Sequence, residues 1–158
     1  MKVLILTTDY PHPNGYVSQY FIHTRNKEYV KKEWIYLYYL FLQKEDYSID
    51  GVNVFTYDTF KNKLEDTKYD ILASHAPNIR QHYIFLKKNN RKFKKIVFFF
   101  HGHEVLKSSQ IYPEPYPYMK KQSFIYNRLG DIYDSIKLRL WNRFFNEHTE
   151  KCEFVFVE

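Results

Sequence analysis

The sequence predicts an α/β fold in which a parallel sheet is covered by helices on both faces. Short apolar runs alternate with longer segments of helical spacing along the 158 residues. Strands that alternate with helices form parallel sheets through right-handed crossover units. A chain of this length suits one domain and can bury a real core. Residues 1–158 are therefore expected to form a single α/β domain.

The first part of the chain supplies three predicted strands. Val3–Leu6 has the apolar character of a buried parallel strand. Trp34–Leu42 is aromatic and β-prone and is predicted as the second strand, although its periodicity leaves a helical extension open. The third is Val52–Tyr57, which follows a turn at Asp50-Gly51.

Two helices are predicted around these strands. The first runs from about Val17 to Lys32, after a loop broken by prolines and glycine. One face of it is expected to hold Val17, Tyr20, Phe21 and Thr24. A second, short helix is expected over Thr59–Asp66.

The second part of the chain continues the alternation. Tyr69–Ser74 and Ile96–Phe100 are predicted strands on either side of a helix over Ile79–Asn90. Alternating prolines make Ile111–Tyr118 an extended loop. A long helix over Lys121–Lys151 then leads to a last strand, Phe154–Val157. Its predicted apolar face consists of Ile125, Leu129, Ile132, Ile136, Leu140 and Phe144. The whole pattern is that of a Rossmann-like domain.

Polar side chains follow three of the predicted strands at the point where each strand ends. In chain order the groups are Asp9, His12 and Asn14, then His75 and Asn78, then His101, His103 and Glu104. Ligands of open α/β sheets bind at the carboxyl ends of the strands. The three groups are therefore expected to line one cleft, provided that the first, fourth and fifth strands are neighbours.

The ordered set of motifs resembles the amino-terminal half of a family-four glycosyltransferase of the GT-B type. The motifs are VLILTTDYPHPNGYVSQYF, DILASHAPN, VFFFHGHEV and a long helix leading to CEFVFVE, and they span nearly the whole chain. The resemblance implies the acceptor-side half of a retaining enzyme that transfers a sugar to a glycan or lipid-linked saccharide. The nucleotide-sugar would be a co-substrate, with no separate cofactor. It would bind mainly to a second domain, which is expected to be missing here, so the chain alone is expected to be inactive.

The resemblance also assigns roles to the strand-end residues. His101 matches the histidine that faces the reacting sugar, where an imidazole or a backbone carbonyl stabilises developing charge or holds a donor hydroxyl. The loop Asn14–Tyr16 corresponds to a Gly-Gly loop near the donor phosphates and the acceptor. Gly15 matches the first glycine and Tyr16 replaces the second. Contacts to the acceptor or sugar would come from His75, Asn78, His103 and Glu104.

Other interpretations of the same residues stay open. His101 could cap the strand end through the backbone, and Pro-Asn-Gly could be a plain turn. His101 and His103 with Glu104, joined by Asp9 or His75, could instead ligate a metal in a hydrolase. A non-catalytic binding or assembly domain is a third class. The chain has no G-x-G-x-x-G motif, so dinucleotide binding is poorly supported.

Composition limits the partners and the compartment. The net charge of +6 suits acidic partners, but the lysines are dispersed, so a solvated basic surface without a nucleic-acid partner is expected. Cys152 is the single cysteine, which excludes an internal disulfide and indicates a reducing compartment. No signal peptide or span-length apolar run is present. A cytoplasmic protein is expected, with peripheral contact to the inner membrane face left open.

Overall fold

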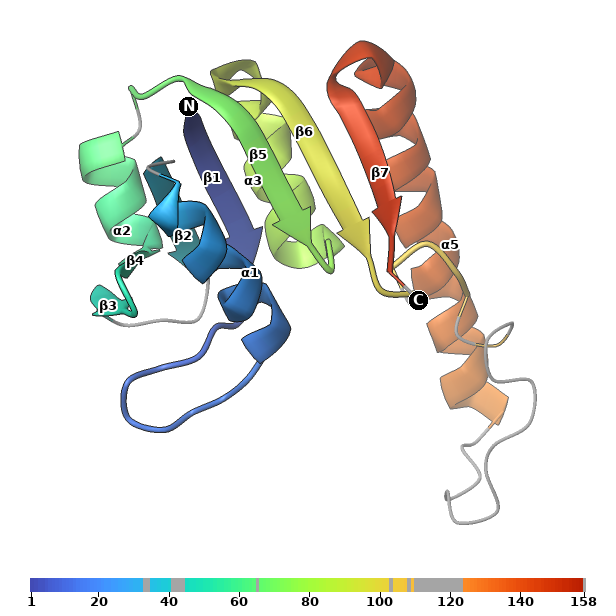
Figure 1. The fold of residues 1–158 in the computed structure, drawn as a ribbon. Coiled ribbons are helices and arrows are strands. Elements are labelled where there is room, and N and C mark those ends of the chain that lie inside the picture. Colours follow the sequence, from blue (N-terminus) through green and yellow to red (C-terminus); the bar gives the residue numbers. More distant parts are fainter. Residues whose placement is uncertain are drawn as a thin grey trace.

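The fold is α/β, built on one seven-stranded sheet (Figure 1). The computed structural model describes residues 1–32, 35–40, 45–64, 66–102, 104–107, 109 and 124–157. Its strands are β1 (Lys2–Thr7), β2 (Ile35–Leu40), β3 (Tyr47–Ile49), β4 (Val52–Thr56), β5 (Tyr69–His75), β6 (Phe93–Phe100) and β7 (Cys152–Phe156). They lie in the order β3-β4-β2-β1-β5-β6-β7. The contiguous strands β1, β5, β6 and β7 are parallel, and β2 and β4 continue the parallel sheet on the other side of β1.

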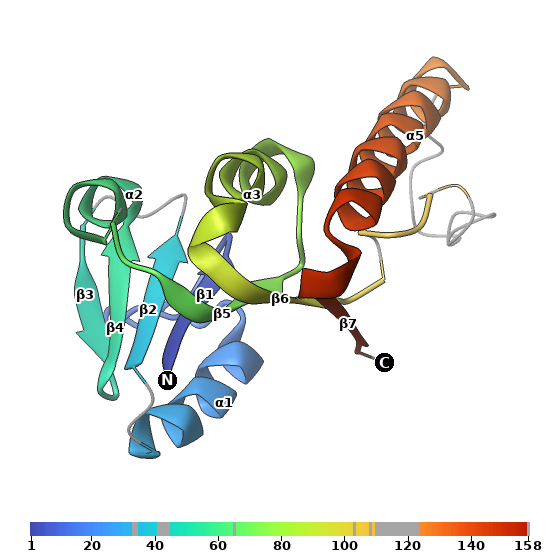
Figure 2. The ribbon, with the colours of Figure 1, turned by 90° about the horizontal axis from the view of Figure 1, so that it is seen from above.

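Helices lie on both faces of the sheet, as predicted (Figure 2). Helix α1 (Tyr20–Lys31) lies on one face, and α2 (Tyr57–Thr59), α3 (Ile84–Asn89) and α5 (Phe124–Glu147) lie on the other. Short π-helical turns, η1 (Phe60–Leu64) and η2 (Ile79–Tyr83), follow α2 and precede α3. The 3₁₀ turns η3 (Asn90–Lys92) and η4 (Thr149–Lys151) lead into β6 and β7.

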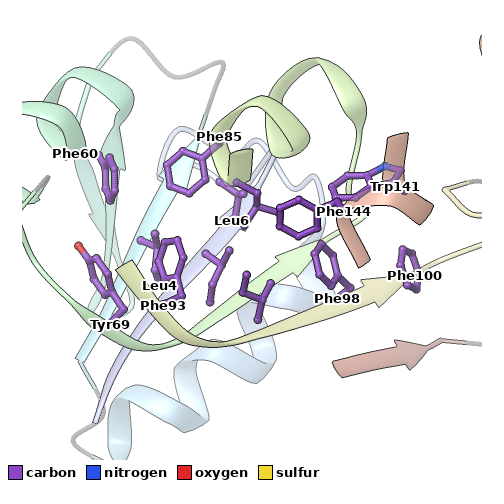
Figure 3. Packing of buried hydrophobic residues seen from close by; sticks show 13 residues of the cluster. Leu4, Leu6, Phe60, Tyr69, Phe85, Phe93, Phe98, Phe100, Trp141 and Phe144 are labelled. Atoms are coloured by element: carbon purple, nitrogen blue, oxygen red, sulfur yellow. The ribbon is translucent and has the colours of Figure 1, made fainter. Parts of the chain in front are cut away.

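The larger hydrophobic core fills the space between the sheet and helices α3 and α5 (Figure 3). It is mostly aromatic, and its centre on α5 is Trp141, which is 1% exposed. The indole ring lies 5.5 Å from the rings of both Tyr83 and Phe98. A second core on the opposite face includes Val3, Ile5 and Ile22, which pack between the sheet and α1. Two cores on a doubly covered sheet explain why the strands are apolar on both sides.

The hairpin of β3 and β4 was not expected from the sequence. The two strands pair antiparallel, and the turn between them is Asp50-Gly51. Asp50 and Gly51 have φ angles of 51° and 79°, the left-handed conformations that a two-residue hairpin turn requires. The Asp-Gly signal therefore marks a hairpin with a strand on each side, rather than an isolated turn before one strand.

Helix α1 begins at Tyr20 rather than near Val17, and the face predicted for it is wrong. Val17, Tyr20, Phe21 and Thr24 are exposed, whereas Ile22, His23 and Asn26 are buried. The reason is a polar network that a count of apolar residues does not detect. The His23 imidazole bonds the Tyr10 hydroxyl at 2.9 Å and Asp50 Oδ2 at 3.0 Å. These bonds fix the rotation of α1 on the sheet.

Helix α5 also uses a different face from the one predicted. Phe144 is buried, but Ile125, Leu129, Ile132 and Ile136 are exposed. The first turns of α5 extend beyond the end of β7 (Figure 1), so their apolar face does not lie over the sheet. Further along, Lys137 is buried beside Asp134, with Nζ 2.7 Å from Oδ1, and it donates to the Leu106 carbonyl at 3.1 Å. Ion pairing thus lets two charged residues occupy the inner face.

The remaining predicted elements match the structure, with shifted ends. β1, β5, β6 and β7 correspond to predicted strands, and β2 confirms the strand character of residues 35–40. Trp34, Phe41 and Leu42 lie outside the described residues, as does the predicted loop Ile111–Tyr118. Within the described part of the chain, no helix has the length and apolar character needed to cross a bilayer.

Candidate functional site

Strands β1, β5 and β6 are direct neighbours in the sheet, which confirms the condition for bringing their polar ends together. Their carboxyl ends point to the same edge (Figure 1). His75 is the last residue of β5, and His101 directly follows β6. The loop that begins with Thr8 and Asp9 leaves β1 at this edge. We refer to this place as the carboxyl edge.

His75 and His101 lie side by side at the carboxyl edge, with ring centroids 6.2 Å apart. His75 is 2% exposed and stacks on Phe99 at 4.3 Å. His75 Nδ1 and His101 Nε2 are both buried, and neither has a hydrogen-bond partner among the described residues. Buried polar atoms are nearly always hydrogen-bonded. Two such nitrogens on neighbouring strand ends are therefore suited to bind a ligand's polar groups.

The backbone around the two histidines is sharply turned. Ala76 follows His75 with a left-handed φ of 47°, which is uncommon for a residue with a side chain. Gly102 follows His101 with a φ of 114°, a conformation that favours glycine. The His101 backbone N–H donates to Glu104 Oε2 at 2.9 Å. The Glu104 carboxylate therefore holds the turn that positions His101, instead of pointing freely at a ligand.

The His75 imidazole is neutral at physiological pH. Burial lowers its pKa to about 3, and the nearby Arg25, His101 and His82 act in the same direction. A neutral imidazole offers one N–H donor and one acceptor nitrogen. The pair can therefore orient hydroxyl groups without adding the positive charge of a protonated His75.

Stability is expected to fall when the pH is lowered from about 6.5 toward 3. Burial lowers the pKa of both His75 and His82 from 6.5 to about 3. Between these values the unfolded chain binds protons that the folded protein excludes, so the free energy of unfolding decreases with decreasing pH. Urea midpoints at pH 7.5 and 5.0 test this. His82→Gln should weaken the dependence, whereas His148→Gln, at a partly exposed position, serves as the control. A midpoint independent of pH would contradict the burial of these imidazoles.

Helix α1 contributes two residues that the sequence analysis did not assign to the site. The Phe21 ring lies 5.2 Å from the His101 ring and is half exposed. The Arg25 guanidinium lies 5.2 Å from the centre of the Phe99 ring, which also carries the stacked His75. The two residues are one helical turn apart and so share a face. The sequence alone does not show which face of α1 lies toward the carboxyl edge, because this depends on how the helix is rotated on the sheet.

The loop Asn14–Tyr16 is held by its own hydrogen bonds. The His12 N–H donates to the Tyr16 carbonyl at 2.9 Å, and the Tyr16 hydroxyl donates to Asp9 Oδ2 at 2.6 Å. This bond to Asp9 raises the Tyr16 pKa. Gly15 has a φ of 97°, so the turn itself requires glycine. A cleft that runs from Gly15 to His101 stays a prediction. The ring contact with His101 comes from Phe21 on α1, and not from this loop.

Asn78 caps the helical turn η2. Its Oδ1 accepts the Gln81 backbone N–H at 2.8 Å, and its Nδ2 donates to Gln81 Oε1 at 3.0 Å. Such a cap satisfies a backbone donor that the helix leaves unpaired. In this conformation the amide therefore has a structural role. His103, the remaining predicted contact, lies outside the described residues.

Other sites for a metal or small ligand find little support in the described part of the chain. No three His, Cys, Asp or Glu side chains among the described residues gather as metal ligands. A cavity of about 260 Å³ lies against α2, η2 and α3, lined by Tyr57, Arg80, Gln81, Ile84, Phe85, Lys88 and Asn89. It does not include the strand-end residues. Burial raises the pKa of the Cys152 thiol to about 11, so this thiol stays protonated at neutral pH.

The carboxyl edge therefore combines the buried His75, the partly exposed His101, an exposed phenylalanine and an arginine, in an arrangement suited to a polar ligand with an apolar face. Aromatic rings pack on apolar faces, and the imidazoles hydrogen-bond to hydroxyl groups. Comparisons with models of known protein families, with curated proteins and with solved structures find no match to this chain.

Proposed function

We propose that this chain is the acceptor-side, Rossmann-like half of a GT-B glycosyltransferase. In the complete enzyme it transfers a sugar from a nucleotide-sugar to a glycan or lipid-linked saccharide. The ordered motifs of the sequence support the proposal. The observation that carries it is the pairing of His75 with His101 at the carboxyl edge, each with a buried ring nitrogen that has no partner among the described residues.

The His75–His101 pair suits the chemistry of retaining sugar transfer. The transition state resembles an oxocarbenium ion, in which positive charge develops near the anomeric carbon. The neutral His75 imidazole presents a nitrogen lone pair or an N–H without opposing that charge. We assign His101 to the reacting sugar and the neutral His75 to orienting hydroxyl groups. The exposed ring of Phe21 beside His101 offers an apolar surface for the C–H face of a sugar ring.

The donor half of the enzyme belongs to a second domain in this proposal. Closure of the two domains aligns the anomeric carbon with the acceptor hydroxyl and excludes water. No separate cofactor is required. The enzyme works in the cytoplasm, in peripheral contact with the membrane where its acceptor is lipid-linked.

Residues 1–158 alone are expected neither to bind a nucleotide-sugar tightly nor to transfer its sugar, because the donor site is assigned to the second domain. Isothermal titration calorimetry with UDP-, GDP- and dTDP-sugars, together with a transfer assay, measures both. Turnover by the purified chain without a partner would contradict the proposal. So would elemental analysis showing about one tightly bound zinc or manganese per chain, which would support the hydrolase class instead.

A further inference from the structure

Among the described residues, the outer side of β7 is an open sheet edge. β7 is the last strand in the sheet and pairs with β6 on one side. Within the described part of the chain, no other strand pairs with it. The exposed apolar residues here are Phe154, Val155 and Phe156 of β7 and Val157, which directly follows the strand. Such an edge presents main-chain donors and acceptors to any strand that approaches it.

The two edges of the sheet differ in how they are protected. The opposite edge is β3, a three-residue strand at the tip of a hairpin. β7 has five residues, contains no proline and carries one charged side chain, Glu153. Lys95 on β6 holds that carboxylate, with Nζ 2.6 Å from Oε1. Short strands, prolines and exposed charges are the usual ways of preventing edge pairing, and β7 uses none of them effectively.

Hydrogen-bond directions along β7 identify which residues face outward. The Val157 N–H donates to the Phe100 carbonyl of β6 at 2.9 Å. Successive residues of a strand direct their N–H and C=O groups to opposite sides. The main-chain groups of Val155 therefore face β6, as those of Val157 do. Those of Phe154 and Phe156 face the open edge.

The sequence of this edge is symmetric about Val155. Phe154 and Phe156 lie on either side of it, both with outward main-chain groups. In an antiparallel pair with an identical strand, Phe154 would exchange two main-chain hydrogen bonds with Phe156 of the other copy, and Val155 would face its own equivalent. A two-fold axis requires this kind of self-complementarity. We propose that β7 pairs antiparallel with β7 of a second copy of this chain, about a two-fold axis at Val155.

Side-chain packing supports the same register. The Phe154 ring already stacks on Phe98 at 6.0 Å, and the Phe156 ring lies 5.5 Å from Phe100. Directly opposed residues of antiparallel strands lie on the same face. Pairing would therefore extend this row of phenylalanine rings across the axis into the other copy. Glu153 would lie opposite Val157 of the other copy, so no like charges would meet.

The dimer is expected to be weak. Pairing of one five-residue strand buries less than the roughly 1,200–2,000 Å² of a standard interface. We therefore expect the dimer to form only at high protein concentration. The net charge of +6 on each copy opposes association, so added salt should tighten the dimer. The proposal is independent of the proposed catalytic function.

Sedimentation equilibrium of residues 1–158 tests the proposal. Phe156→Lys places a charge at the open edge on both sides of the axis, and it should raise the dissociation constant at least about tenfold. The matched control is Ile125→Lys on α5, because Ile125 is 70% exposed and Phe156 is 69% exposed. The control should change the constant by less than about twofold. Circular dichroism melting checks that both variants fold.

A cross-linking experiment tests the register directly. In a Cys152→Ser background, Val155→Cys should form a covalent dimer on mild oxidation. Val155 would face its own equivalent in a non-hydrogen-bonded pair, in which the Cβ atoms lie at the short end of the roughly 4.5–5.5 Å range and so near the roughly 3.5–4.5 Å of a disulfide. Two results would overturn the proposal. One is a chain that stays monomeric throughout the concentration series. The other is equal loss of the dimer in both lysine variants, which would place the interface on α5.

Discussion

Replacing His101 with alanine is expected to lower sugar transfer by about 10²-fold or more in a protein that joins this chain to the proposed donor-binding domain. That is the scale observed when one positioned contact to a reacting group is removed. The structure supplies the reason, because His101 lies at the carboxyl edge beside His75 with a ring nitrogen free of partners among the described residues. Steady-state turnover with saturating donor and acceptor measures the effect.

The matched control for this substitution is His148→Ala. His148 bonds the Phe144 carbonyl through Nδ1 at 2.9 Å. It precedes β7 and so lies near the amino end of that strand, away from the carboxyl edge. It should leave turnover within about twofold of the parent. Thermal melting of both variants separates catalysis from folding. Lower stability of His101→Ala with unchanged turnover would show that His101 only stabilises the end of β6.

Replacing Trp141 with alanine is expected to destabilise the fold by about 3–5 kcal/mol, the range measured for large aromatic side chains in cores. Trp141 is buried between α5 and the sheet, where its ring contacts Tyr83, Phe98 and Phe145. The substitution leaves a cavity that these rings cannot close. Urea-induced unfolding followed by circular dichroism measures the change.

Ile132→Ala on the same helix is the control for Trp141. Ile132 belongs to the exposed half of α5, so its truncation should change the free energy of unfolding by no more than about 0.5 kcal/mol. If the two substitutions have similar effects, α5 does not pack through Trp141. If an interface covers the exposed half of α5, Ile132→Ala should also lower the free energy of unfolding, by more than about 0.5 kcal/mol.

The strands could be predicted from sequence because their apolar runs depend on burial on both sides of the sheet. β1, β5 and β6 were each predicted, with their polar ends, from short runs that stop at Asp9, His75 and His101. Their adjacency was a condition of the predicted cleft, and the strand order of the structure supplies it. Local sequence patterns were sufficient for the strands and their polar ends, but not for the order of the strands in the sheet.

The helix faces could not be predicted, because polar contacts between distant segments set them. The rotation of α1 depends on His23, which joins Tyr10 to Asp50 across segments far apart in the chain. The inner face of α5 includes Asp134 and Lys137, which can be buried because they pair with each other and Lys137 also donates to the Leu106 carbonyl. Phe21 was missed as a site residue for the same reason, since its position beside His101 depends on the rotation of α1.

The central claim is that the pair of histidines at the carboxyl edge binds a saccharide. Nuclear magnetic resonance of the imidazole nitrogens of His75 and His101 tests it most directly, during titration with short oligosaccharides of glucose, galactose, N-acetylglucosamine and rhamnose. We expect at least one of them to shift the signals of both histidines, and Phe21→Ala to weaken that binding. Saccharide binding that leaves both imidazoles unchanged, or shifts centred on the cavity beside α3, would contradict the account.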